Sequence, residues 1–239
     1  MASHAKKQAG LRSMTAREDI LNSIRRARGR KTGAPPKSAM ERLNAPSLNI
    51  IPERGKVADD LKIKQFIIEA EKVQATTKSI KTSGEIANAV SDYLKSNNLP
   101  ASIKVSNDPL IYQVNWQKTP ALNVSNEPIC GSDEVGVSVA YSGIAETGTL
   151  VFLSGPDNPT RLNFYPLTHI AVVQAKNITG AYETVWQRIR AQNKSKNAKG
   201  IMPRAVNFIT GPSRTADIEQ TLLLGAHGPQ RLHIIIVGE

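Results

Sequence analysis

The chain has 239 residues, is 40% hydrophobic, contains one cysteine and carries a formal net charge of +11. This length and hydrophobic fraction predict one sizeable α/β domain with an added arm, and argue against a disordered chain. The single cysteine, Cys130, excludes an internal disulfide framework and any iron–sulfur cluster or cysteine-rich zinc site held by this chain alone. No apolar run reaches the roughly 18 residues of a membrane-spanning helix, and the basic N-terminus lacks the apolar segment of a secretory signal. We therefore expect a cytoplasmic protein without a membrane span.

The positive charge lies mainly in residues 1–56. They hold 13 Lys/Arg against 4 Asp/Glu, a balance of +9, whereas residues 57–239 hold 18 against 16. Thr15 with Glu18 predicts a capped helix over about residues 15–30, and the prolines that follow predict an extended segment. We expect residues 1–56 to form a basic arm that docks on an acidic partner or on its own domain. Nucleic-acid binding is disfavoured because the arm has no aromatic residue for stacking.

Residues 57–239 have the pattern of an α/β domain. The pattern predicts three helices. The first covers residues 59–80, and the second runs from a capping box at Thr82–Glu85 to about Asn97. The third covers residues 180–192, with Thr179 as its N-cap. Several of the short apolar runs are continuous rather than alternating, which is typical of strands covered on both faces. The sequence therefore predicts a three-layer α/β sandwich with a mostly parallel sheet, whose strands lie at 102–106, 135–141, 149–154, 169–174, 205–210 and 232–238.

The segment GIAETGT (143–149) places Glu146 at the mouth of a predicted strand. Gly143 and Gly148 on either side give the backbone the freedom to turn tightly. A carboxylate held there can serve as a general base or a covalent nucleophile. The alternative is a turn carboxylate that accepts hydrogen bonds in the region of Thr147 and Thr149.

The segment ITGPSRTADIE (209–219) follows the end of another predicted strand. Gly211, Ser213, Arg214 and Thr215 bring backbone N–H groups, hydroxyls and a cation together where a helix is expected to begin at Ala216. These groups suit a phosphate or carboxylate. The alternative is an ordinary helix N-cap, with Asp217 in the first turn.

The segment LGAHGPQRLH (224–233) exposes a histidine in a rigid turn. Gly225 and Gly228–Pro229 would present His227 as an acid–base group, an anion donor or a metal ligand. Together with His169 and Glu146 it could form a His/His/carboxylate metal site. The histidine spacing matches no local metal motif, so no metal site is predicted. His169 opens a strand, and its alternative role is purely structural.

The blocks AETGT and TGPSRTADIE…LGxHGP, in this order, resemble the LUD-domain family of lactate utilization proteins over roughly residues 57–239. The resemblance implies a NagB/RpiA/CoA-transferase-like fold. It also implies a role in oxidising L-lactate to pyruvate as a cluster-free subunit. The implied companions are a cysteine-rich iron–sulfur protein and a protein that joins a LUD domain to a ferredoxin-like domain. We accordingly expect no cofactor on this chain alone, and iron–sulfur clusters on the partner subunits.

The family's motif positions fall on Glu146, Thr147, Gly148, Thr149, His169, Gly211, Ser213, Thr215, Asp217, Glu219, Gly225, His227, Gly228 and Pro229. We predict Glu146, His169 and His227 as catalytic residues. The predicted contacts to an anion or small carboxylate are Thr147, Gly148, Thr149, Gly211, Ser213, Arg214, Thr215, Asp217, Gly225 and Gly228. Two other functions stay open: a stand-alone CoA-transferase or sugar-phosphate isomerase-like enzyme using Glu146, and a metabolite-sensing scaffold or regulatory protein. A homo-oligomer also stays open.

Overall fold

The computed structural model describes residues 16–29, 37–45, 49–195, 202–216 and 222–238. The chain divides into two compact units, residues 1–48 and 49–239. The first unit contains helix α1 (Ala16–Ala27), in the range predicted for the arm, and a further helix, α2 (Lys37–Asn44). Acidic residues in the first turn of α1 and arginines in its last turn complement the helix dipole. Thr15, the predicted cap of this helix, lies outside the described residues.

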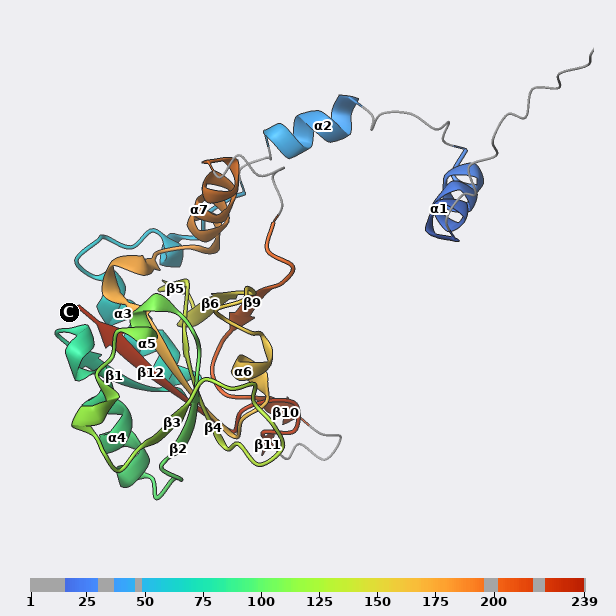
Figure 1. Cartoon of the computed structure of the whole chain (residues 1–239). Helices are drawn as coiled ribbons and strands as arrows, with labels where there is room; N and C mark the ends of the chain where they lie inside the picture. The colour runs from blue at the N-terminus through green and yellow to red at the C-terminus, as the bar shows by residue number, and fades with distance from the viewer. Residues whose placement is uncertain (1–15, 30–36, 46–48, 196–201, 217–221, 239) are drawn as a thin grey trace, which may run out of the picture. The chain divides into compact units, whose positions relative to one another are not determined.

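The second unit contains the remaining helices and strands (Figure 1). Its helices are α3 (Lys62–Lys72), α4 (Ile86–Ser96), α5 (Pro109–Tyr112), α6 (Arg161–Phe164) and α7 (Tyr182–Ser195). Its strands are β1 (Thr76–Ile80), β2 (Ser102–Val105), β3 (Asn123–Ser125), β4 (Val135–Val139), β5 (Ser142–Ile144), β6 (Thr149–Leu153), β7 (Thr168–Gln174), β8 (Ile178–Thr179), β9 (Val206–Ile209), β10 (Arg214–Ala216), β11 (Leu222–Leu224) and β12 (Arg231–Val237).

Six of these strands form a parallel sheet in the order β1-β12-β7-β4-β2-β3. Strands β7 and β12 are buried on both faces, which explains their continuous apolar sequences. In β12, Ile235 and Val237 pack with α4, whereas Ile234 and Ile236 pack on the opposite face of the sheet. This alternation follows from the two-residue period of a strand.

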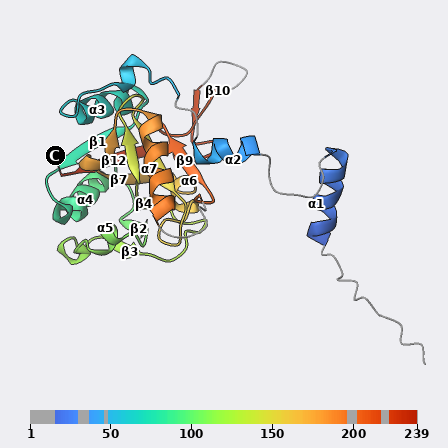
Figure 2. The same cartoon turned by 90° about the horizontal axis from the view of Figure 1, so that it is seen from above.

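Different layers cover the two faces of the parallel sheet. In Figure 1 and Figure 2, α3 and α4 lie on opposite sides of β1 and β12. The face on the α3 side is also covered by a second sheet, β8-β5-β6-β9, through Leu150 and Phe152. Helix α7 packs on the other face of that second sheet through Val185 and Ile189. The predicted α/β fold with a mostly parallel sheet is confirmed, and the mixed second sheet is an addition to it.

Two of the predicted strands are in the second sheet rather than the parallel one. The predicted run 135–141 ends as β4 at Val139, and the chain re-enters a strand as β5. Residues 145–148 then turn the chain so that β6 pairs antiparallel with β5 and with β9. The runs 149–154 and 205–210 are therefore strands, but they do not join the main sheet.

The helix predicted over 59–80 is wrong in its second half. Helix α3 ends at Lys72, and Gln74 adopts a φ of +70°, which reverses the chain into β1. The residues of β1 then pair in parallel with β12. The Thr82–Glu85 capping box is confirmed, because each of its two reciprocal bonds is present. Among the described residues, no helix is long and apolar enough to cross a membrane.

Candidate functional site

Glu146 lies in the turn of the β5–β6 hairpin and is buried there. Its Oε1 accepts a hydrogen bond from Arg54 Nε at 3.1 Å, and its backbone N–H donates to the Gly180 carbonyl at 3.0 Å. A Cβ added to Gly55 would lie 3.2 Å from Glu146 Oε2, and one added to Gly180 would lie 2.3 Å from the Gly55 carbonyl oxygen. The carboxylate therefore bonds the segment around Arg54 to the β5–β6 hairpin.

The rest of the AETGT turn joins three parts of the domain. Gly148 has a φ of +64°, and a Cβ there would lie 2.1 Å from the Ala70 backbone nitrogen of α3. The Thr149 hydroxyl lies 2.7 Å from that of Thr147 and 2.9 Å from that of Tyr182 at the start of α7. It also lies 2.7 Å from the hydroxyl of Thr210, the residue after β9. This hydroxyl cluster positions the loop that begins at Thr210.

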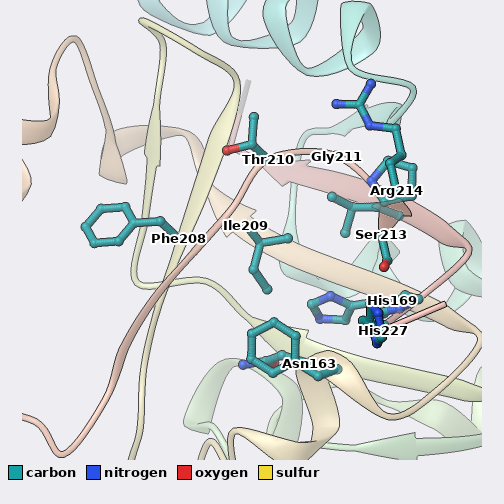
Figure 3. Close-up of a pocket in the computed structure, with 14 residues that line it drawn as sticks. Asn163, His169, Phe208, Ile209, Thr210, Gly211, Ser213, Arg214 and His227 are labelled. Atoms are coloured by element: carbon teal, nitrogen blue, oxygen red, sulfur yellow. The ribbon is translucent and has the colours of Figure 1, made fainter. Parts of the chain in front are cut away.

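A pocket of about 360 Å³ lies where that loop meets the turn before β12 (Figure 3). Its volume is within the range of small-ligand sites. The described residues that line it include no Asp or Glu, and Arg214 is the one among them with a permanent positive charge. They are Asn163, Phe164, His169, Phe208, Ile209, Thr210, Gly211, Pro212, Ser213, Arg214, His227, Gly228, Pro229 and Leu232.

Backbone hydrogen bonds hold the two predicted loops together at the pocket. Ser213 N–H donates to the Pro229 carbonyl at 2.8 Å, and Gly225 N–H donates to the Ser213 carbonyl at 2.9 Å. Gly211, with a φ of +73°, lets the chain pass Val73, because a Cβ there would lie 2.3 Å from the Val73 carbonyl oxygen. The Ser213 loop and the His227 turn, although separate in the sequence, are therefore in direct contact.

The polar groups of the pocket differ in exposure and direction. His227 and Arg214 are exposed, and Ser213 is half-buried. In Figure 3 the Ser213 hydroxyl points toward His169 and His227, whereas the Arg214 guanidinium extends away from them. The Ser213 hydroxyl and the His227 imidazole can together bind a small anion, and Arg214 adds a positive charge to the lining of the pocket.

His169 forms the floor of this pocket and has no exposed surface. Its Nε2 lies 2.8 Å from the Ser138 hydroxyl, and that hydroxyl donates to Asn163 Oδ1 at 2.8 Å. Its Nδ1 is buried and has no hydrogen-bond partner in the described part of the chain. Burial lowers the pKa of His169 to about 3, so the ring is neutral near pH 7.

The pocket lies at the amino ends of two strands of the parallel sheet. His169 is the second residue of β7, and Leu232 is the second residue of β12. Open α/β sheets usually bind ligands beyond the carboxyl ends of their strands. Here the loop that follows β9 of the second sheet forms the site at the amino ends of the strands instead.

The structure unites some of the predicted site residues and separates others. His169, Gly211, Ser213, Arg214, His227, Gly228 and Pro229 line one pocket. Glu146 is not among its lining residues, so the structure separates it from His169 and His227, the other two residues predicted as catalytic. Thr149 bonds to Thr210 at the start of the pocket loop, Thr147 bonds to Thr149, and Gly148 packs against α3.

The helix expected from Ala216 is replaced by the β10–β11 hairpin, in which Arg214 pairs with Leu224. Residues 214–216, as the structure describes them, therefore offer the anion site a strand rather than a helix N-terminus. Thr215 lies in β10, but its side chain is outside the description, and Asp217 and Glu219 lie outside the described residues. Gly225, with a φ of +84°, shapes the turn without lining the pocket.

The structure also corrects the predicted role of Thr179, and it does not assemble the residues considered as an alternative metal site. Thr179 is in β8, and its hydroxyl donates to the Gly143 carbonyl at 3.3 Å instead of capping α7. The His/His/carboxylate set is not assembled, because Glu146 is paired with Arg54 outside the pocket. Within the described ranges, no group of three or more His, Cys, Asp or Glu is arranged to hold a metal ion.

Sequence reasoning missed Ser138 and Asn163, which hold the buried face of His169. Ser138 carried a usable signal, because it is a polar residue inside the apolar run VGVSVAY. Asn163 lies in the short helix α6 and had no such signal.

Comparison with known proteins agrees with the family resemblance of the sequence. The profile of the LUD domain matches residues 63–237. Lactate utilization protein C of Geobacillus kaustophilus (strain HTA426) is 35% identical over 120 residues, which make up 49% of this chain and 48% of that protein. Lactate utilization protein C of Bacillus subtilis (strain 168) is 35% identical over 120 residues, 47% of each chain. The chain therefore spans about half the length of these relatives.

A solved structure supports the fold alone. The crystal structure of a DUF162 family protein from Deinococcus radiodurans superimposes with a TM-score of 0.52 at 21% sequence identity. The match covers 76% of this chain and 99% of that one.

Proposed function

Because this chain belongs to the LUD-domain family, we propose that it takes part in lactate utilization by binding a small carboxylate in the pocket between the Ser213 loop and the His227 turn. The observation that carries the proposal is the composition of that pocket. Arg214, Ser213 and His227 offer a cation and hydrogen-bond donors, and no acidic side chain is among the described lining residues. The relatives named lactate utilization protein C support lactate as the metabolite.

We further propose that the chain is the cluster-free subunit of an L-lactate oxidation system. The single, exposed Cys130 supports this assignment, since iron–sulfur clusters are held by several cysteine thiolates. Electron transfer would then belong to iron–sulfur companion proteins, and this subunit would bind the carboxylate or assemble the redox subunits. The contact of the exposed Arg54 with the buried Glu146 carboxylate supports a structural role for Glu146 rather than nucleophilic chemistry.

Growth tests the proposal in the cell. A strain in which Arg214→Ala replaces the natural protein should grow more slowly on L-lactate as sole carbon source, and normally on glucose. Arg204→Ala is the matched control, because Arg204 is exposed and is not among the pocket-lining residues. Normal growth of both the Arg214→Ala strain and a deletion strain on lactate would refute a role in lactate utilization. Co-purification of iron–sulfur proteins with the tagged full chain tests the assembly role.

A further inference from the structure

The hydrogen-bond chain beneath the pocket fixes which nitrogen of His169 carries the proton. The Ser138 hydroxyl has one proton, and it donates that proton to Asn163 Oδ1. Its 2.8 Å contact with His169 Nε2 therefore requires Nε2–H as the donor. Since the neutral imidazole carries one proton, Nδ1 is left as a lone-pair acceptor.

This acceptor has no hydrogen-bond partner among the residues that the structure describes. Nδ1 is buried and unpaired among the described residues, although most buried polar atoms in proteins are hydrogen-bonded. His169 lines the floor of the pocket, so a ligand in the pocket can supply the missing donor. The ring has no exposed surface, so the side chains that cover it must shift for a ligand to reach it.

We infer that His169 is a specificity-determining residue, whose Nδ1 accepts a hydrogen bond from the hydroxyl of a 2-hydroxy carboxylate held through its carboxylate by Ser213. The inference rests on the proposed carboxylate site. A 2-oxo acid offers the same carboxylate, but its keto oxygen is an acceptor and cannot bond to a lone pair. The pocket therefore prefers the hydroxy form of a substrate to the corresponding oxo form.

The fixed tautomer is essential to this preference. A histidine that could place its proton on Nδ1 would donate to a keto oxygen as readily as it accepts from a hydroxyl. Ser138 and Asn163 remove that freedom from the buried side of the ring. They are positioning residues, since they act on the ligand through His169.

Calorimetric titration of the full chain with L-lactate, pyruvate and propionate tests the inference. L-lactate should bind about tenfold more tightly than pyruvate, because a buried acceptor gains or loses its partner. Propionate, which lacks the hydroxyl, should also bind more weakly than L-lactate. Equal affinities for all three would overturn the inference and leave the carboxylate pocket intact, whereas binding of none would overturn the proposed function itself.

Two histidine variants separate the ligand contact from a structural role. His169→Gln can keep the donor to Ser138 but lacks Nδ1, so it should lose the preference for lactate over pyruvate and keep its affinity for propionate. His233→Gln is the control, because His233 is buried, is bonded through Nδ1 to Thr76 and does not line the pocket. A retained preference in folded His169→Gln would overturn the inference.

Nitrogen-15 NMR of the unaltered chain gives a test that requires no folded variant. The free chain should show the neutral Nε2–H tautomer for His169, and L-lactate should shift the Nδ1 signal. An Nδ1–H tautomer in the free chain, or an Nδ1 signal that is unchanged at saturating lactate, would overturn the inference.

Discussion

Thr149 and Thr210 share a hydrogen bond of 2.7 Å between their hydroxyls, which joins the AETGT turn to the loop that lines the pocket. The two segments are far apart in the sequence, and this bond gives the turn a supporting role. Glu146 has a structural role as well, because it forms an ion pair that joins Arg54 to the same hairpin. The AETGT motif therefore supports the loop of the pocket without lining the pocket itself.

Removing the Thr149 hydroxyl should destabilise the domain. Thr149→Val keeps the shape of the side chain but removes the hydrogen bonds that the buried Thr149 hydroxyl makes with Thr147, Tyr182 and Thr210, each worth about 0.5–1.5 kcal/mol of unfolding free energy. Urea denaturation measures the loss. Thr168→Val is the matched control, because the Thr168 hydroxyl is buried without a partner in the described structure, and its removal should be neutral or stabilising. Equal destabilisation by both variants would contradict the assigned cluster.

Adding a methyl group at Gly148 should disrupt the contact between the hairpin and α3. An alanine there would hold an unfavourable φ of +64° and place its Cβ 2.1 Å from the Ala70 nitrogen. Gly148→Ala is thus expected to lower the melting temperature strongly or to prevent folding. Gly155→Ala is the control, since a Cβ at Gly155 meets nothing within 4 Å. A stable Gly148→Ala protein would show that the turn is packed differently.

Glu146 should be dispensable for binding at the pocket. Glu146→Gln can still accept from Arg54, so the variant should fold and bind propionate with unchanged affinity in calorimetry. Arg54→Ala should lower the unfolding free energy by less than the roughly 3–5 kcal/mol of a fully buried pair, because Arg54 is 68% exposed. Loss of propionate binding in folded Glu146→Gln would restore Glu146 to the site.

Much of the domain, but less of the site, could be predicted from the sequence. The apolar runs of β7 and β12 and the capping box before α4 are local signals, and each was confirmed. The second sheet depends on a hairpin turn at residues 145–148 and on pairing with β9, which no local pattern encodes. For the same reason the sequence identified His169, Ser213 and His227 only as separate motifs at strand ends. It could not show that they share one pocket or that Glu146 lies outside that pocket.

Stability should fall as the pH is lowered, because two buried histidines resist protonation. Burial lowers the pKa of His169 to about 3 and that of His233 to about 4, from an ordinary value of 6.5. Between about pH 6.5 and these values the unfolded chain binds more protons than the folded one, so the unfolding free energy rises with pH. Each histidine contributes a slope of at most about 1.4 kcal/mol per pH unit.

Urea denaturation between pH 4.5 and 7.5 measures this slope. Carboxylates also contribute to the slope, but they are the same in the unaltered chain and in His233→Gln, so the difference between the two slopes reports His233. The variant should show a shallower rise of stability with pH than the unaltered chain. Identical slopes would contradict burial of His233 as a neutral ring.

Backbone chemical-shift mapping of the full chain with L-lactate tests the central claim, that the pocket between the Ser213 loop and the His227 turn binds a small carboxylate. The account predicts that the largest amide shifts fall on Gly211, Ser213 and Gly228, with little change at Glu146. Largest shifts at Glu146 and Gly180, or no shifts at saturating lactate, would contradict it.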